Sequence, residues 1–201
     1  MFQKNLIINP WIIVIMISIL LGFVFTVYIL QIRKGNRKSN KLLALFLFAI
    51  TLLLFSNFVV LSNLFKVYPH LLGISFLLWY ILPPTFYLYV KTGIYSNHKL
   101  KWLHILHYAP FIYMLIKLLP FYLLNAGVKL KWFENFMDAP RSLTGSAFFV
   151  IIYSFAYLLA CIWLFIKFKK NYKSKFANTH FEHFDGIKRL LLIYLIYKVL
   201  D

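Results

Sequence analysis

Acidic residues, cysteine, glycine and proline are all scarce in this sequence. Among 201 residues there are 5 Asp and Glu, 1 Cys, 7 Gly and 7 Pro. The single cysteine, Cys161, excludes an intrachain disulfide framework, and the low glycine content excludes a collagen-like chain. There is no Gly-rich phosphate loop, nucleophile elbow or Ser/His/Asp arrangement, so the sequence predicts neither an enzyme nor a cofactor.

Apolar surface is what the chain has in excess. Hydrophobic residues make up 62% of it and aromatic residues 20%, whereas charged residues make up only 13%. Soluble domains are nearer half apolar and a quarter charged, and a chain of this size has too little interior to hide the difference. The composition therefore excludes a soluble globular domain and a disordered chain, and it predicts an integral membrane protein.

Five apolar runs are long enough to cross a bilayer as helices. They cover residues 11–32, 42–65, 71–90, 102–124 and 142–166. A sixth run, 190–200, is too short to span alone, so it is either the start of a further span or a helix on the membrane surface. We predict an all-α, polytopic transmembrane helix bundle that forms one domain over residues 1–201.

The basic residues fall mainly on alternate connections between these runs. Fifteen lie in the connections that follow the first, third and fifth runs, and five lie on the opposite side. Under the positive-inside rule, this bias predicts a multi-pass protein of the cell (inner or plasma) membrane with its N-terminus outside. Because the charges are spread over three loops, we expect binding to lipid headgroups and no direct nucleic-acid binding, and self-association stays open. The headgroup candidates are Arg33, Lys34, Arg37, Lys38, Lys169 and Lys170.

Two pairs of histidines are the candidates for a metal site. His104 and His107 lie in the fourth run, and His180 and His183 lie in the last basic loop. Residues three apart share a helix face, and four imidazoles at one membrane face can hold zinc, copper, iron or nickel. Histidines at a membrane interface also hydrogen-bond headgroups, water or loop carbonyls. We favour that structural role and predict no metal centre.

Lys117 is the one basic residue well inside a long run. A charge at mid-membrane costs about 2.5–3.5 kcal/mol on insertion scales, which makes Lys117 a candidate functional residue. It lies about two turns from the outer end, so its ammonium either snorkels to the headgroup layer or pairs within the bundle. The third and fourth runs also contain prolines, which remove backbone donors and are expected to kink helices that border a cavity: Pro83, Pro84, Pro110 and Pro120.

The outer loop 125–141 is predicted to contain a short interfacial helix. Its apolar residues fit one helix face: Leu130, Trp132, Phe133, Phe136 and Met137. Such a helix either receives a signal or belongs to the aromatic belt at the membrane interface.

Three short motifs occur in a characteristic order. Asn40-Lys-Leu-Leu-Ala-Leu-Phe-Leu47 opens the second run, Pro84-Thr-Phe-Tyr-Leu-Tyr-Val-Lys91 closes the third, and His107-Tyr-Ala-Pro-Phe111 lies early in the fourth. Over about residues 40–125, this order resembles the N-terminal membrane region of bacterial membrane-anchored AraC-type transcriptional regulators. Pro83 stands where that family has Gly, and Tyr108 stands where it has Phe.

The resemblance implies a multi-span sensor that precedes a cytoplasmic helix-turn-helix domain. No such domain precedes Asp201, so we expect this chain to be the sensory and anchoring module of a regulator, cut before its output. Similar membrane modules precede histidine kinases. A small membrane enzyme or transporter that uses the histidines, and an interaction subunit, are the alternatives. The candidate signal or cavity residues are Pro84, Tyr89, His107, Pro110 and Lys117.

Overall fold

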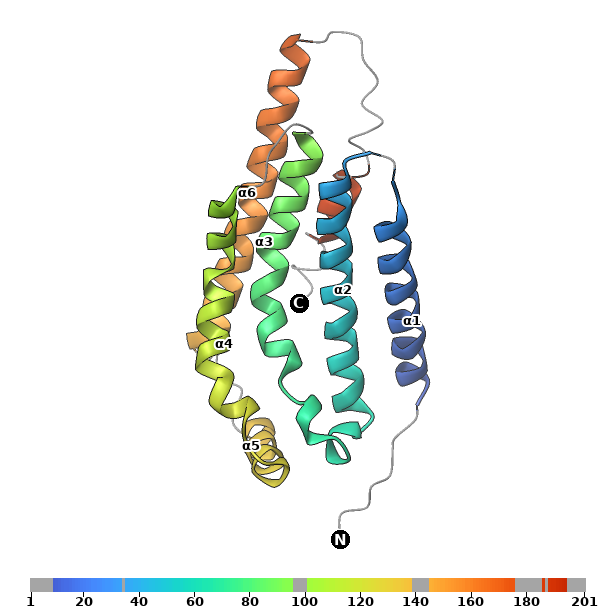
Figure 1. Ribbon diagram of the computed structural model, residues 1–201, viewed down its shortest axis with the longest axis vertical. Coiled ribbons are helices and arrows are strands. Elements are labelled where there is room, and N and C mark those ends of the chain that lie inside the picture. Colours follow the sequence, from blue (N-terminus) through green and yellow to red (C-terminus); the bar gives the residue numbers. More distant parts are fainter. Residues whose placement is uncertain are drawn as a thin grey trace.

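The structure, a computed structural model, describes residues 9–33, 35–95, 101–138, 145–175, 186 and 188–194. Across that part of the chain the regular elements are all helices, with no strand (Figure 1). Five described segments are long and apolar enough to cross a membrane: Pro10–Gln31, Arg37–Leu61, Pro69–Ile94, Trp102–Tyr122 and Phe148–Lys170. The predicted all-α bundle of a multi-span membrane protein is confirmed.

Helix α1 (Pro10–Gln31) is started by an asparagine followed by a proline. The side-chain oxygen of Asn9 accepts a hydrogen bond from the backbone N–H of Ile12 at 2.9 Å. Pro10 lies in the first turn, where backbone N–H groups have no acceptor within the helix, so its lack of an N–H costs no hydrogen bond. The helix therefore begins within one residue of the predicted span 11–32.

Helix α2 (Arg37–Leu61) begins five residues before the predicted span 42–65. The reason is Asn36, whose side-chain oxygen accepts from two backbone N–H groups of the first turn at 3.1 and 3.4 Å. The side-chain amide of Asn36 also donates to the carbonyl oxygen of Thr92 at 2.8 Å, which ties the start of α2 to the end of a later helix. The basic residues 37–41 are consequently helical rather than part of a loop.

Close packing of α1 on α2 depends on a glycine. A Cβ built on Gly22 would overlap the Oγ1 atom of Thr51, so only glycine lets the two backbones approach this closely. Two threonine hydroxyls near the contact donate within their own helices, Thr26 to Gly22 at 2.8 Å and Thr51 to Leu47 at 2.9 Å. Small residues and hydroxyls that bond within their own helix are typical of helix contacts in membranes. There the hydrophobic effect does not drive helices together, because the lipid tails are as apolar as the side chains.

The connection from α2 to α3 contains two short 3₁₀ helices, η1 (Leu64–Lys66) and η2 (Pro69–Leu71). They include the end of the predicted span 42–65 and the first residue of the predicted span 71–90. Gly73 separates η2 from α3 (Ile74–Ile94) with a φ of 86°, and a Cβ there would lie 2.7 Å from a ring atom of Phe121. A glycine is therefore required on both counts. Helix α3 continues four residues beyond the predicted end at residue 90 and is assigned without a break through Pro83 and Pro84.

The fourth predicted span, 102–124, is divided into the 3₁₀ helix η3 (Trp102–Tyr108) and helix α4 (Ala109–Tyr122). The physical reason is Pro110, which has no N–H to give to the carbonyl of Leu106 four residues earlier. That carbonyl accepts instead from the N–H of Ala109, three residues away, which is the 3₁₀ pattern.

The connection predicted to lie outside contains the predicted short helix, α5 (Ala126–Asp138). Its residues Leu130 and Phe133 pack against a buried cluster at that end of the bundle. The last long helix, α6 (Gly145–Lys175), runs nine residues past the predicted end at residue 166. It therefore carries the basic residues 167–170 as helix rather than as loop.

The main core lies between α2, α3 and α6. Phe86, Val90, Leu158 and Cys161 are almost fully buried there, and the buried thiol agrees with the packing role expected of a lone cysteine in an apolar run. The described part of the sixth run, 190–194, contributes further buried side chains, Leu191 and Tyr194, to the same core. This placement favours the bundle interior over a helix lying on the membrane surface.

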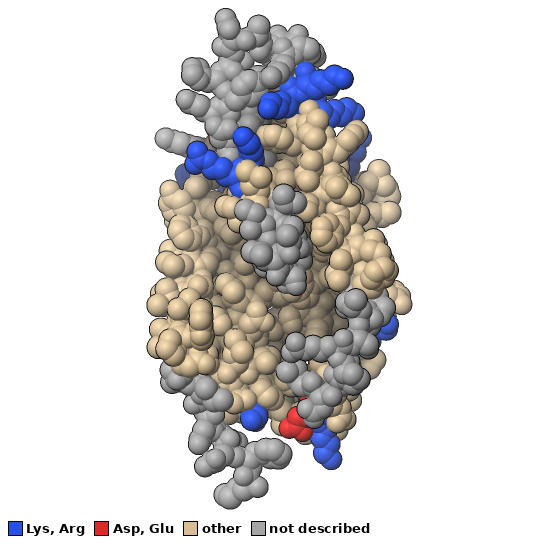
Figure 2. All heavy atoms as spheres, turned by 180° about the vertical axis from the view of Figure 1, so that it is seen from behind, with Lys and Arg blue, Asp and Glu red and all other residues tan. Residues whose placement is uncertain are grey.

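Charge is segregated to the ends of the molecule. Figure 2 shows Lys and Arg gathered near one end, with a broad middle band that is almost uncharged on the visible face. In Figure 1 that end is where α1, α3 and α6 finish and where α2 begins. The structure thus brings the described ends of the three basic connections to one end of the bundle, although the side of the membrane that they face stays a prediction.

Candidate functional site

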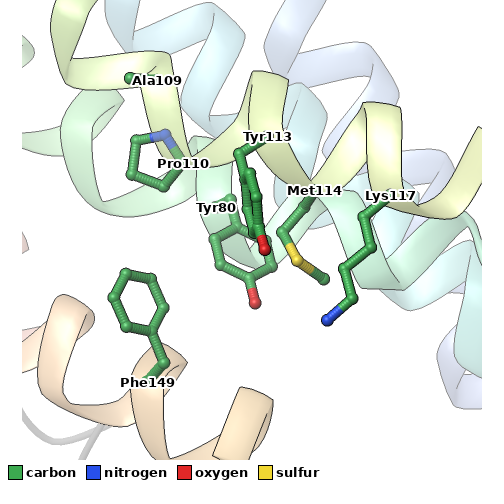
Figure 3. Close-up of a pocket in the computed structure, with 7 residues that line it drawn as sticks. All are labelled: Tyr80, Ala109, Pro110, Tyr113, Met114, Lys117 and Phe149. Carbon is green, nitrogen blue, oxygen red and sulfur yellow. The ribbon is translucent and has the colours of Figure 1, made fainter.

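A cleft of about 500 Å³ lies between α3, α4 and α6. This volume falls within the range of small-molecule sites. Figure 3 shows the lining side chains coming from all three helices. They are Tyr80 on α3, Phe149 on α6, and Ala109, Pro110, Tyr113, Met114 and Lys117 on α4.

The cleft exists because α4 covers the bundle only loosely. Its residues Tyr113, Ile116 and Leu119 are largely exposed, and its main contacts are with α3 and with η3. Ala109 has only a methyl group to fill the space beside α6, and Pro110 adds a compact ring. An apolar hollow therefore stays open at the side of the bundle, where a membrane protein faces lipid.

Three polar groups point toward one side of this apolar space. In Figure 3 the ammonium of Lys117 and the hydroxyls of Tyr80 and Tyr113 extend from α3 and α4 into the open region in front of α6. Among the residues that the structure describes, none hydrogen-bonds or pairs with the Lys117 ammonium. Two of the predicted cavity residues, Pro110 and Lys117, are thus found at the cleft.

Tyr153 of α6 links the walls of the cleft through one hydroxyl. It donates to the carbonyl oxygen of His107 at 3.0 Å, and it lies 3.4 Å from that of Tyr80. Tyr80 lies four residues before Pro84 in an α-helix, and His107 lies three residues before Pro110 at a 3₁₀ turn. Pro84 removes the N–H that would otherwise approach the carbonyl of Tyr80, so at that position Tyr153 supplies a donor where the α-helical backbone cannot.

His107 belongs to this linkage. Its Nδ1 atom lies 2.8 Å from the hydroxyl of Tyr157, and its ring is 5.5 Å from that of Tyr87. The neighbouring His104 contacts the backbone of Lys101, with its Nδ1 atom 2.8 Å from the amide nitrogen. No group of three metal-ligating residues comes together within the described ranges, and His180 and His183 lie outside them.

Comparison with known proteins gives this cleft no precedent. No protein-family model, curated protein or solved structure matches the chain. The likeness to AraC-type regulators thus stays a prediction carried by the motif residues alone.

The remaining cavity candidates have structural positions behind the cleft. Pro84 and Tyr89 are buried in α3, and neither they nor His107 line the cleft. Tyr108 joins η3 to α3, since its hydroxyl is 2.9 Å from that of Thr85. The motif residues Thr85 and Tyr108 therefore connect α3 to η3. Of the candidate residues predicted within the motifs, Pro110 lines the cleft, and Pro84, Tyr89 and His107 do not.

Sequence reasoning missed the aromatic contribution of α6. Phe149, Tyr153 and Tyr157 are spaced by four residues and so share one helix face, which is a signal that the sequence did contain. The rings of Tyr153 and Tyr157 are 5.0 Å apart, and those of Phe149 and Tyr153 are 5.9 Å apart. The first member of this stripe, Phe149, lines the cleft opposite α4.

A buried lysine at the other end of α4 was also missed. Lys129 of α5 is 1% exposed, and its ammonium donates to the carbonyl of Tyr122 at 2.9 Å and lies 3.1 Å from Nδ1 of His70. It also lies over the ring of Phe121, with 5.7 Å to the centroid. These contacts join α5 to the end of α4 and to η2, so Lys129 has a structural role.

The headgroup candidates lie at the basic end. Arg33, Arg37, Lys38, Lys169 and Lys170 are all exposed there, as lipid contact requires. Lys34 lies outside the described residues.

Proposed function

We propose that this chain is the membrane-embedded sensory and anchoring module of a regulator. The observation that carries the proposal is the course of α6 (Figure 1). One end of this helix forms a wall of the cleft at Phe149, and the other end carries the basic residues of the opposite end of the bundle. A signal that alters the cleft therefore acts on the same rigid element that reaches the basic end.

The distance covered by that element supports the proposal. Phe149 and Lys170 are separated by about 32 Å along a continuous helix. Helices shift by about 1–2 Å in many switching proteins, because packed interfaces have discrete arrangements. Tyr153, which joins α6 to α3 and to η3 beside the cleft, is the contact that such a shift would rearrange.

The signal would select between two packings of the bundle. A ligand shifts such an equilibrium only by the difference in its affinity for the two states. A cleft bounded by the loosely packed α4 would bind a ligand with different affinity in the two packings, because the width of the cleft depends on the position of α4 relative to α6. The output in this proposal is a cytoplasmic DNA-binding domain, as the likeness to AraC-type regulators implies.

The conformational part of the proposal is tested by filling the cleft. Ala109→Phe adds a ring to the cleft, and Ile116→Phe adds the same ring to an exposed position of the same helix that does not line it. Spin labels attached at Lys38→Cys and Lys170→Cys, in a Cys161→Ala background in lipid nanodiscs, report the distance between the basic ends of α2 and α6. We expect Ala109→Phe to change this distance distribution by about 1–2 Å or more and Ile116→Phe to leave it unchanged.

Two results would contradict the proposal. One is an unchanged distribution in Ala109→Phe and in the cleft-enlarging Phe149→Ala, with both proteins folded by circular dichroism. The other concerns the output and comes from the gene beyond the codon for Asp201. An in-frame helix-turn-helix domain supports a transcription regulator, and a kinase domain or an immediate stop codon opposes it.

A further inference from the structure

We infer that the cleft between α3, α4 and α6 binds a long-chain carboxylate, a single-chain amphiphile of the fatty-acid type, whose head group pairs with Lys117. The inference rests on the proposed function in taking this cleft as the site where the signal arrives. It adds the chemical class of the ligand and the residue that recognises its charge.

The charge of the ligand follows from the state of Lys117. Its ammonium extends into the cleft in Figure 3, and no described residue pairs with it. A charge in an apolar segment is costly unless it is paired. An anionic head group would supply the missing partner, and a charged hydrogen bond of this kind is about twice as strong as a neutral one.

The hydroxyls beside the lysine favour a carboxylate. Tyr80 and Tyr113 point into the same space as Lys117, and no described residue hydrogen-bonds to either hydroxyl. A carboxylate has two oxygen atoms that accept several hydrogen bonds, so one ammonium and two phenolic O–H groups match its capacity. The hydroxyl of a fatty alcohol would leave part of this donor set unused.

The rest of the cleft fits one hydrocarbon chain. Lys117 and Pro110 are seven residues apart on α4, which corresponds to about 10 Å along the helix. Between and opposite them the lining is apolar, with Met114 on α4 and the ring of Phe149 on α6. The chain of a single-chain amphiphile would therefore run along α4 from the lysine toward Pro110.

The depth of the lysine agrees with a ligand that comes from the bilayer. Lys117 is five residues from the end of α4 at Tyr122, or about 7–8 Å, so a carboxylate there lies near the membrane interface while its chain stays in the hydrocarbon. The cleft is open at the side of the bundle rather than buried, which gives such a molecule an entry from the lipid phase.

Equilibrium binding of radiolabelled oleate and of radiolabelled oleyl alcohol to the purified full chain tests this inference. The two probes share a hydrocarbon chain and differ in the charge of the head group. The protein is held in nanodiscs of zwitterionic phosphatidylcholine at low salt, so that lipid charge does not compete. We expect oleate to bind about tenfold more tightly than oleyl alcohol, which is the effect of one well-placed charged pair.

Matched variants assign the preference to the cleft. Lys117→Met should reduce oleate affinity about tenfold, to that of the alcohol, and Lys117→Arg should keep the preference because it keeps the charge. Lys131→Met removes an exposed lysine of α5 outside the cleft and should change neither affinity. Phe149→Ala should weaken both probes alike, because it removes apolar contact and no charge.

Equal affinities of the wild type for the two probes would overturn the inference, and so would an undiminished preference in Lys117→Met. A result for Lys117→Met cannot be attributed to misfolding, because replacing a membrane-embedded lysine by an apolar residue favours insertion. The spin-label pair separates the two proposals. Oleate binding that depends on Lys117 without any change at α6 would refute the sensory function and leave the ligand assignment intact. A change in the spin-label distance to α6 in Ala109→Phe, without selective oleate binding, would refute the ligand assignment and leave the sensory function intact.

Discussion

Removal of the Tyr153 hydroxyl is the most informative single perturbation of the seam between α3, η3 and α6. Tyr153→Phe keeps the ring and its contacts, such as the 5.0 Å centroid distance to Tyr157. It deletes the donor that lies 3.0 Å from the carbonyl of His107 and 3.4 Å from that of Tyr80. Because Pro84 has no N–H to give to the carbonyl of Tyr80, the α-helical backbone cannot replace the lost donor there.

The expected magnitude follows from these distances. Side-chain hydrogen bonds between membrane helices average about 0.6 kcal/mol and reach about 1.7 kcal/mol, and a carbonyl left without a donor costs about 1–3 kcal/mol. One hydrogen cannot serve two acceptors fully, so the shorter bond to His107 dominates. We therefore expect Tyr153→Phe to lower the free energy of unfolding by about 1–2 kcal/mol.

Reversible unfolding in mixed micelles of a mild detergent and sodium dodecyl sulfate, followed by circular dichroism, measures this free energy. The matched control is Tyr113→Phe, the same substitution at a cleft tyrosine whose hydroxyl has no partner among the described residues. It should change the free energy of unfolding by less than about 0.5 kcal/mol. Equal effects of the two substitutions, or no effect of Tyr153→Phe, would refute the role assigned to this hydroxyl.

Three further predictions concern the rest of the bundle. Gly22→Ala should destabilise the protein by about 1–3 kcal/mol because its Cβ overlaps Thr51, and the added substitution Thr51→Ala should recover part of that loss in a double-mutant cycle. Gly127→Ala, which meets open space on α5, is the neutral control. Lys129→Met should lower stability by about 1–3 kcal/mol, since the carbonyl of Tyr122 loses its donor, whereas the exposed neighbour Lys131→Met should not; similar unfolding curves for the two would oppose this assignment. An impermeant thiol reagent on intact cells, with Cys161→Ala as background, should label Asn135→Cys on α5 and spare Lys38→Cys at the basic end, and the reverse pattern would invert the predicted orientation.

Apolar run length predicted the number and order of the spanning segments well, and it located their ends less well. The ends depend on single side chains whose effect is local but whose partners are distant in sequence. Asn36 starts α2 five residues early and also binds Thr92 on α3, and only the first of these roles can be read from the sequence. Pro110 was expected to kink one long helix, and it divides that span into η3 and α4 instead.

The candidate site was predicted in part, for a similar reason. An intramembrane charge is conspicuous in any sequence, so Lys117 was found, and it does line the cleft. Tyr80 and Phe149 were not found, because aromatic residues are common throughout this chain. The four-residue spacing of Phe149, Tyr153 and Tyr157 marks a shared helix face but does not say what that face contacts. Their place at the cleft follows from how α3 and α6 pack, which depends on contacts between residues far apart along the chain.

The contact between α1 and α2 makes the first helix a separable part of the protein. Its substantial packing is with α2 alone, and most of its large side chains face outward along its whole length. Helices that insert independently associate afterwards through such close-packed contacts. A chain divided between residues 34 and 35 should therefore reassemble when both pieces are made in one cell. By the same logic, the first helix of one molecule can pack on α2 of another, an exchange that would join two copies without any new interface.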